Sequence, residues 1–183
     1  MRLKLKVRHY DLEMLGERSR EISYGELAHL ALYFLEPLPN NYGRKELKKA
    51  VSRAVERALS LADFRFRESF IEAKDFLQKI LLKALLLKEA KPFFVEGVKY
   101  FNELEVHDSS GELHRLDRLV YTETGTVILE YKLGSRRKAH LEQAKLYQRI
   151  IHEILGVRPK TYLFYLEEPS LLDINSIKQL PLW

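Results

Sequence analysis

Hydrophobic residues recur with a helical period in the first half of the chain. This pattern predicts helices over residues 23–36, 44–61 and 63–90. Ser23 and Glu26 form a capping box for the first of them, and Pro37 ends it. In the second, we expect one buried stripe, formed by Leu47, Val51, Val55 and Leu59.

From Pro92 onwards the period changes to that of strands. We expect strands over 93–96, 101–107, 112–121, 126–132 and 161–166, with turns at 108–111 and 122–125. A helix over 137–155, ending at Gly156, separates the last two strands. Residues 2–8 also alternate, as a strand or a charged extended arm would, and no element is assigned after residue 166. The order predicts an α/β fold with a mixed central β-sheet flanked by helices and a helical N-terminal part.

Length and composition limit the organisation of the chain. Its 183 residues are 46% hydrophobic, which suits one domain with a real core. We expect an arm or linker over 1–21 and a single domain over 22–183. The chain has no cysteine, which excludes disulfide scaffolds, cysteine-bound zinc and iron–sulfur centres, and thiol nucleophiles.

The basic residues are concentrated in one stretch. The net charge is +5, but residues 132–160 alone carry eight Lys or Arg against two Glu, so the rest of the chain sums to −1. This predicts a localised contact with a polyanion. The N-terminus does not resemble a signal peptide, and the most apolar stretch, 80–87, is interrupted by Lys83 and is too short to cross a bilayer. We therefore expect a soluble, cytoplasmic protein that makes no membrane contact.

Two acidic residues and a lysine are expected to converge in the sheet. In one strand Leu113, Arg115, Asp117, Leu119 and Tyr121 share a face, and in the next Glu130 and Lys132 share a face. A tight turn between the strands allows Asp117 and Glu130 to meet, and such paired carboxylates favour a divalent cation. A metal-bound water and a neighbouring lysine are typical of phosphodiester hydrolysis. The alternative is an ordinary strand in which Asp117 pairs with Arg115 or Arg118.

The helix after this strand carries two further candidates. Gln143 and Tyr147 are four residues apart and share one helical face, from which they could bind a phosphate oxygen or hold a catalytic lysine. The alternative for Tyr147 is core packing.

In their order, these motifs resemble the PD-(D/E)XK nuclease superfamily. The run Leu-Asp-Arg at 116–118, Ile-Leu-Glu-Tyr-Lys-Leu-Gly at 128–134 and Glu-Gln-Ala-Lys-Leu-Tyr at 142–147 is most similar to the nuclease domain that ends the RecB and AddA helicase–nucleases. The likeness covers about residues 22–166 and implies a restriction-endonuclease-like core. Two departures are Arg115, where the family usually has Gly, and Glu130, where it has Asp.

The resemblance assigns roles to individual residues. It implies a Mg²⁺- or Mn²⁺-dependent deoxyribonuclease whose catalytic residues are Asp117, Glu130, Lys132, Gln143 and Tyr147. His29, in Gly-Glu-Leu-Ala-His at 25–29, becomes a metal ligand beside Asp117 and Glu130, and imidazole would suit Mn²⁺ better than Mg²⁺. Without the resemblance, a lone histidine on an apolar helix such as His29 is more often a buried, hydrogen-bonded core residue than a ligand. An assisting Glu on the preceding strand is either Glu103 or Glu105.

A basic cluster, Arg136, Arg137 and Lys138, directly follows the lysine strand and is a candidate for sequence-independent contacts with a nucleic-acid backbone. The alternative is a solvated helix end. The other basic run, over 44–53, is interpreted as a solvated helix face.

The expected substrate is single-stranded DNA or duplex ends, cut during recombination or repair. The chain has no Gly-x4-Gly-Lys-Ser/Thr loop, so an ATP-driven helicase partner of the UvrD, AddA or RecB type would lie on another polypeptide or on a longer parent chain. The alternative functions are a non-catalytic DNA-binding or scaffold module with a nuclease-like fold, and an unrelated strand-rich domain. Exonuclease or endonuclease action, polarity, DNA or RNA preference and oligomeric state stay open.

Overall fold

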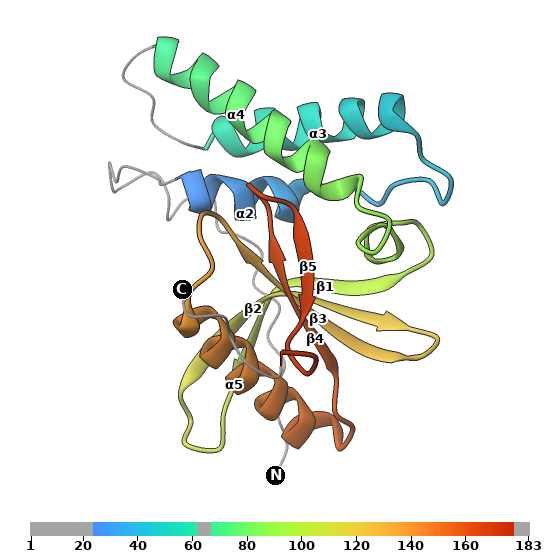
Figure 1. Ribbon diagram of the computed structural model, residues 1–183, viewed down its shortest axis with the longest axis vertical. Helices are drawn as coiled ribbons and strands as arrows, with labels where there is room; N and C mark the ends of the chain where they lie inside the picture. Colours follow the sequence, from blue (N-terminus) through green and yellow to red (C-terminus); the bar gives the residue numbers. More distant parts are fainter. Residues whose placement is uncertain (1–23, 62–66, 178–183) are drawn as a thin grey trace. The chain divides into compact units, whose positions relative to one another are not determined.

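The computed structural model describes residues 24–61 and 67–177, which form two compact units (Figure 1). The helical unit contains the described residues of 10–96 together with 166–169. The sheet unit contains 97–165 and the described residues of 170–183. The predicted α/β fold with a mixed sheet is confirmed. The predicted arm over 1–21 lies outside the described residues, and the single domain over 22–183 stays a prediction.

Three helices that pack against one another make up the helical unit: α2 (Tyr24–Phe34), α3 (Arg44–Leu59) and α4 (Arg67–Leu85). The predicted capping residue of α2, Ser23, lies outside the described residues. At the start of α3, the backbone N–H of Gly43 donates to Glu46 Oε2 at 3.0 Å, which satisfies one of the amides left open at a helix N-terminus. The predicted stripe of α3 is buried, with Leu47, Val51, Val55 and Leu59 all at most 1% exposed.

The segment after α4 differs from the prediction. The helix ends at Leu85 rather than near 90, and the expected strand over 93–96 is a 3₁₀ turn, η1 (Lys91–Phe93), followed by an isolated bridge between Leu38 and Val95. Pro92 explains the turn, because its fixed φ suits a helical turn and its nitrogen cannot donate to a ladder.

The sheet unit is built on five strands in sequence order: β1 (Lys99–His107), β2 (Leu113–Thr122), β3 (Gly125–Lys132), β4 (Lys160–Tyr165) and β5 (Ser170–Asp173). The pairs β1–β2, β2–β3 and β4–β5 are antiparallel, whereas β3–β4 is parallel. A parallel pair needs a long crossover, and helix α5 (Lys138–Leu155) supplies it. As predicted, α5 is followed by Gly156, whose φ of 71° ends the helix in the left-handed region. The sequence analysis missed β5.

Helix α5 lies against one face of the sheet and forms its core there (Figure 1). One cluster joins the helix to the first three strands: Leu104, Val106, Leu116, Leu119, Ile128, Tyr147, Ile150 and Ile151. Leu116 and Leu119 both belong to it, so the strict alternation predicted for β2 is wrong. Leu113 is 51% exposed while Leu119 is 2% exposed, although both were expected on one face. The break falls where the β2–β3 ladder ends, at Arg118 opposite Leu129, and beside Glu103 of β1, which has a φ of 50°.

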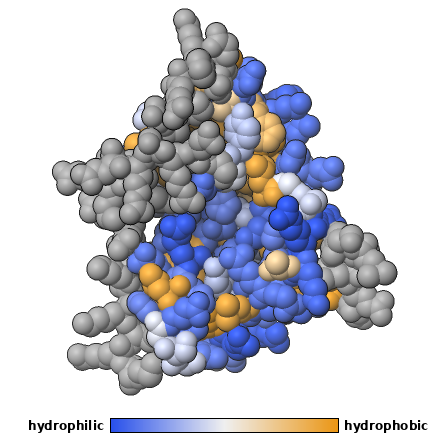
Figure 2. All heavy atoms as spheres, turned by 90° about the vertical axis from the view of Figure 1, so that its left-hand side faces the viewer, coloured by the Kyte–Doolittle hydropathy of each residue, from blue (hydrophilic) through white to orange (hydrophobic). Residues whose placement is uncertain are grey.

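The described surface is mainly hydrophilic on the face drawn in Figure 2, where hydrophobic side chains gather only in small patches. Among residues 24–61 and 67–177, no helix combines the length and the apolar character needed to span a bilayer.

Candidate active site

Asp117 and Glu130 lie at matching positions on adjacent strands. The β2–β3 pairing ends with Arg118 opposite Leu129, and Asp117 and Glu130 are the next residue on each strand. There the side chains replace the regular ladder: the Tyr131 N–H donates to Asp117 Oδ2 at 2.7 Å, and the Asp117 N–H donates to Glu130 Oε1 at 3.4 Å. Both carboxylates are buried, with residue exposures of 8% and 1%. The structure therefore brings together the two acidic residues that the sequence analysis paired.

Lys132 connects this acidic pair to α5. Its Nζ lies 3.5 Å from Glu130 Oε2 and donates to Gln143 Oε1 at 2.8 Å. Gln143 Nε2 in turn donates to the hydroxyl of Tyr147 at 2.9 Å. The Tyr147 ring packs in the α5 cluster, so both interpretations of this residue hold at once: its ring is core and its hydroxyl is part of a polar chain. The five residues predicted as catalytic thus form one connected group.

The electrostatics of the group are dominated by the acidic pair. Burial and the negative charge of Asp117 raise the pKa of Glu130 well above its usual value, and the positive charge of Lys132 opposes this only in part. Burial, and then the charge of Glu130, also raise the pKa of Tyr147. A buried pair of carboxylates is costly, and a bound cation would relieve that cost.

A third carboxylate, Glu103, lies on β1 beside this pair. We call Glu103, Asp117 and Glu130 the acidic row. The β1–β2 register places Asn102 opposite Arg118 and Leu104 opposite Leu116, so Glu103 faces Asp117 across the distorted step. Glu103 is 5% exposed, whereas Glu105 is half-buried and opposite Arg115. The register therefore distinguishes the two residues that the sequence left as alternatives, and it places Glu103 beside the pair.

The two arginines considered as partners of Asp117 have other contacts. Arg115 Nε lies 2.7 Å from Glu103 Oε2. The guanidinium of Arg118, a buried residue, donates to Asn102 Oδ1 at 2.7 Å and stacks over the Tyr100 ring at 3.7 Å. Burial lowers the pKa of Arg118. Both arginines thus brace β1 against β2 around the acidic row.

His29 is half-buried on α2, in the helical unit. Its role as a third metal ligand stays a prediction, as does the alternative of a core histidine.

The basic cluster Arg136, Arg137 and Lys138 is exposed, in the loop after β3 and at the first turn of α5. Arg136 donates to Ser170 Oγ at 3.3 Å, and its guanidinium lies 5.6 Å from the centre of the Tyr165 ring. Arg137 is the N-cap residue of α5. The cluster thus begins four residues after Lys132 and leaves its charges accessible.

Comparisons with known proteins add little to this geometry. No protein-family model matches the sequence, and no curated protein matches it. Among solved structures, the crystal structure of protein VC1899 from Vibrio cholerae matches with 16% sequence identity and a TM-score of 0.38. The match covers 92% of this chain but only 50% of that one, so the chain spans about half the length of its structural neighbour. A similarity of this degree carries no argument about fold or activity.

Proposed function

We propose that this protein is a metal-dependent DNA nuclease. One observation carries the proposal: Asp117 and Glu130 lie beside each other, buried, on adjacent strands, with Lys132 bridging from Glu130 to Gln143. A structural ion pair would need only one carboxylate for the lysine. The row holds two further buried carboxylates, Asp117 and Glu103, and clusters of buried acidic groups around a lysine are typical of phosphodiester chemistry.

The donor set fits Mg²⁺ or Mn²⁺. Asp117, Glu130 and Glu103 offer carboxylate oxygens, the ligands that these ions prefer. Burial and then the charge of Asp117 raise the pKa of Glu130, and a bound cation would favour its ionised form. When bound, the ion supplies Lewis-acid activation of a water and of the phosphoryl oxygen.

The remaining residues position the lysine and the substrate. Lys132 holds three protons on Nζ: one is donated to Gln143 and one is directed to Glu130, so the third is available to a phosphate oxygen or to the attacking water. Gln143 is fixed by Tyr147, which limits the ammonium to one orientation. Arg136, Arg137 and Lys138 offer contacts to the backbone of the strand.

The biological setting follows from the resemblance in the motifs. We propose single-stranded DNA or duplex ends as substrate, processed in the cytoplasm during recombination or repair, with a helicase of the UvrD, AddA or RecB type as partner. This step is an analogy between families.

Cleavage of end-labelled single- and double-stranded DNA tests the proposal, with Mg²⁺, Mn²⁺ or chelator. The wild type should cut only with a divalent ion, and Lys132→Ala should lower the rate by about 10³-fold, because the variant loses the charge closest to the scissile group. Lys160→Ala, an exposed lysine on β4, is the matched control and should cut normally.

Three outcomes would contradict the proposal. Cleavage that survives in chelator excludes the metal site, and a Lys132→Ala variant as active as wild type places the chemistry elsewhere. A wild type that binds DNA, cuts nothing even with a helicase partner, and shows no metal-dependent rise in melting temperature favours the non-catalytic scaffold.

A further inference from the structure

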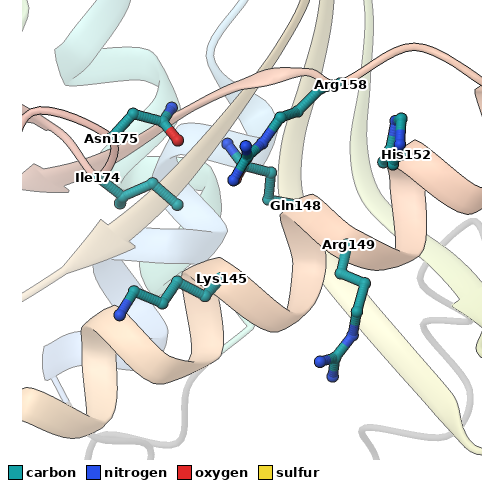
Figure 3. Close-up of a pocket in the computed structure, with 7 residues that line it drawn as sticks. All are labelled: Lys145, Gln148, Arg149, His152, Arg158, Ile174 and Asn175. Atoms are coloured by element: carbon teal, nitrogen blue, oxygen red, sulfur yellow. The ribbon is translucent and has the colours of Figure 1, made fainter.

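A pocket of about 500 Å³ lies on the sheet unit, away from the acidic row. Its lining comes from α5, from the approach to β4 and from the segment after β5: Lys145, Gln148, Arg149, His152, Arg158, Ile174 and Asn175 (Figure 3). At about 3.6 residues per turn, Lys145, Arg149 and His152 lie on the side of α5 opposite Gln143 and Tyr147. The pocket is therefore separate from the candidate active site, and nothing in the proposed chemistry uses it.

The lining is cationic, and it contains no acidic residue. Lys145, Arg149 and Arg158 carry fixed positive charges, and His152 can add one. In the part of the chain that the structure describes, Arg149 and Arg158 have no carboxylate partner, and Lys145 has only a long, exposed contact of 3.7 Å with Glu142. Asp173, close in sequence to Asn175, already accepts hydrogen bonds from that residue at 2.8 and 3.1 Å. The positive charge is left for a ligand.

Arg158 is held in place by a neutral group. Its Nε donates at 3.0 Å to Oε1 of Gln148, a residue that is 3% exposed. Gln148 is oriented by its own Nε2, which donates to the Pro159 carbonyl at 3.0 Å and lies 3.4 Å from Thr161 Oγ1. A carbonyl can only accept, so the amide orientation is determined and its oxygen must face the arginine. The arginine is thereby positioned without being neutralised, and its two Nη groups remain available for a bidentate contact.

These features point to phosphate as the ligand group. A guanidinium fork binds phosphate oxygens in pairs, and a lysine adds a point charge. From Lys145 to His152 the basic side chains extend along α5 for seven residues, roughly 10 Å, which is longer than a single phosphate group. Figure 3 shows Arg158 meeting Gln148 over the helix, Lys145 at one end of the group and His152 at the other, and Arg149 extending from α5 in the direction away from Arg158. A chain of phosphates matches this row better than one isolated anion.

We propose that this pocket binds the phosphodiester backbone of a nucleic-acid strand, as a second contact on the far side of α5 from the candidate active site. The identification of the ligand as a strand rests on the proposed nuclease function, whereas its phosphate chemistry rests on the pocket alone. The excess charge of residues 132–160 is thus divided between the cluster at Arg136–Lys138 and this pocket.

Fluorescence anisotropy tests the proposal, with a labelled single strand of about 20 thymidines in chelator, so that no cleavage occurs. The double variant Arg149→Gln/Arg158→Gln should bind about tenfold more weakly. The slope of log K against log salt should become shallower by about 1.4, since each lost phosphate contact removes about 0.7. Arg149→Gln alone replaces an exposed side chain and should show about half of the slope change, which keeps the test valid if the double variant folds poorly.

The matched control is Lys48→Ala/Lys49→Ala, which removes the same charge from the exposed face of α3. Equal weakening in the control and the pocket variants would overturn the proposal, because net charge would then explain the binding. Loss of thymidine 5′-monophosphate binding with unchanged strand binding would overturn it too, and would identify a site for a free phosphate compound.

Cleavage kinetics separate this proposal from the nuclease function. If the nuclease function and the phosphate-binding pocket are both correct, the pocket variants raise KM for the strand of about 20 thymidines and leave kcat unchanged. If the enzyme is active and the pocket variants have the same KM and Kd as wild type, the pocket proposal is overturned and the nuclease proposal is retained. If the wild type cuts nothing but its strand binding depends on Arg149 and Arg158, the nuclease proposal is overturned and phosphate binding in the pocket is retained.

Discussion

The two sides of α5 carry opposite kinds of polar site. On one side, Lys132 is balanced by Glu130, and Gln143 and Tyr147 hold it by hydrogen bonds of 2.8 and 2.9 Å in series. On the other side, Arg158 is positioned by the neutral Gln148, and no carboxylate lines the pocket. The first arrangement pairs its cation with a carboxylate, while the second leaves its cations without one for an external anion. One helix thus serves both because its two sides meet different partners.

Among the variants that sharpen this comparison, we expect the largest effect on the acidic side. Glu103→Gln should lower cleavage by about 10²-fold, since it removes one charge of the buried row beside Asp117. Glu105→Gln is the matched control, two residues away on the same strand and opposite Arg115, and should leave cleavage unchanged. Rates with Mg²⁺ and Mn²⁺ measure the difference. If both variants are equally impaired, the register argument for Glu103 fails.

A smaller effect tests the chain that holds the lysine. Tyr147→Phe removes the hydroxyl that accepts from Gln143 but keeps the ring in the α5 cluster. We expect kcat to fall about fivefold to tenfold, with KM unchanged and the melting temperature within about 2 °C of wild type. Steady-state kinetics and thermal melting are the measurements. A large loss of stability with normal kcat would show that the residue serves only the core.

The smallest effect concerns stability in chelator. The pKa of Glu130 is raised in the folded state, so its stabilising contribution is complete below the unfolded pKa and is lost as pH rises through the folded value. At about pH 8, Glu130→Gln should therefore melt roughly 3–6 °C above wild type, because a buried charge has been removed. Near pH 4.5 the two should melt alike. Melting curves at both pH values decide this, and a variant less stable than wild type at about pH 8 would contradict it.

The elements of the chain were largely predictable, because local periodicity carries them. The helix over 44–61 and the strands around residues 101–132 match α3, β1, β2 and β3 closely. The missed strand, β5, is four residues long and half-buried throughout, too short for an alternating pattern to stand out. The strand expected over 93–96 failed because the backbone constraint of Pro92 outweighs an apolar run.

The candidate site was predictable only where its residues are close in sequence. Asp117 and Glu130 lie on two strands joined by a tight turn, so register alone brings them together. Holding the lysine was one of two roles expected for Gln143 and Tyr147, and the contact of Lys132 with Gln143 forms because α5 crosses back over β3. The choice between Glu103 and Glu105 needed the distorted step in β1, which no local pattern reveals.

By itself, the sequence determined the α/β order of elements, the concentration of positive charge over 132–160 and the acidic pair with its lysine. All three depend on neighbours along the chain or on one turn. Only the tertiary structure decided the row of three carboxylates, the break in alternation at Leu116–Leu119 and the division of the basic residues between two sides of α5. Arg158 and Asn175 line one pocket with Lys145 because β4 and β5 fold back beside α5. Contacts between residues so far apart in sequence depend on packing, which hydrophobic periodicity constrains but does not specify.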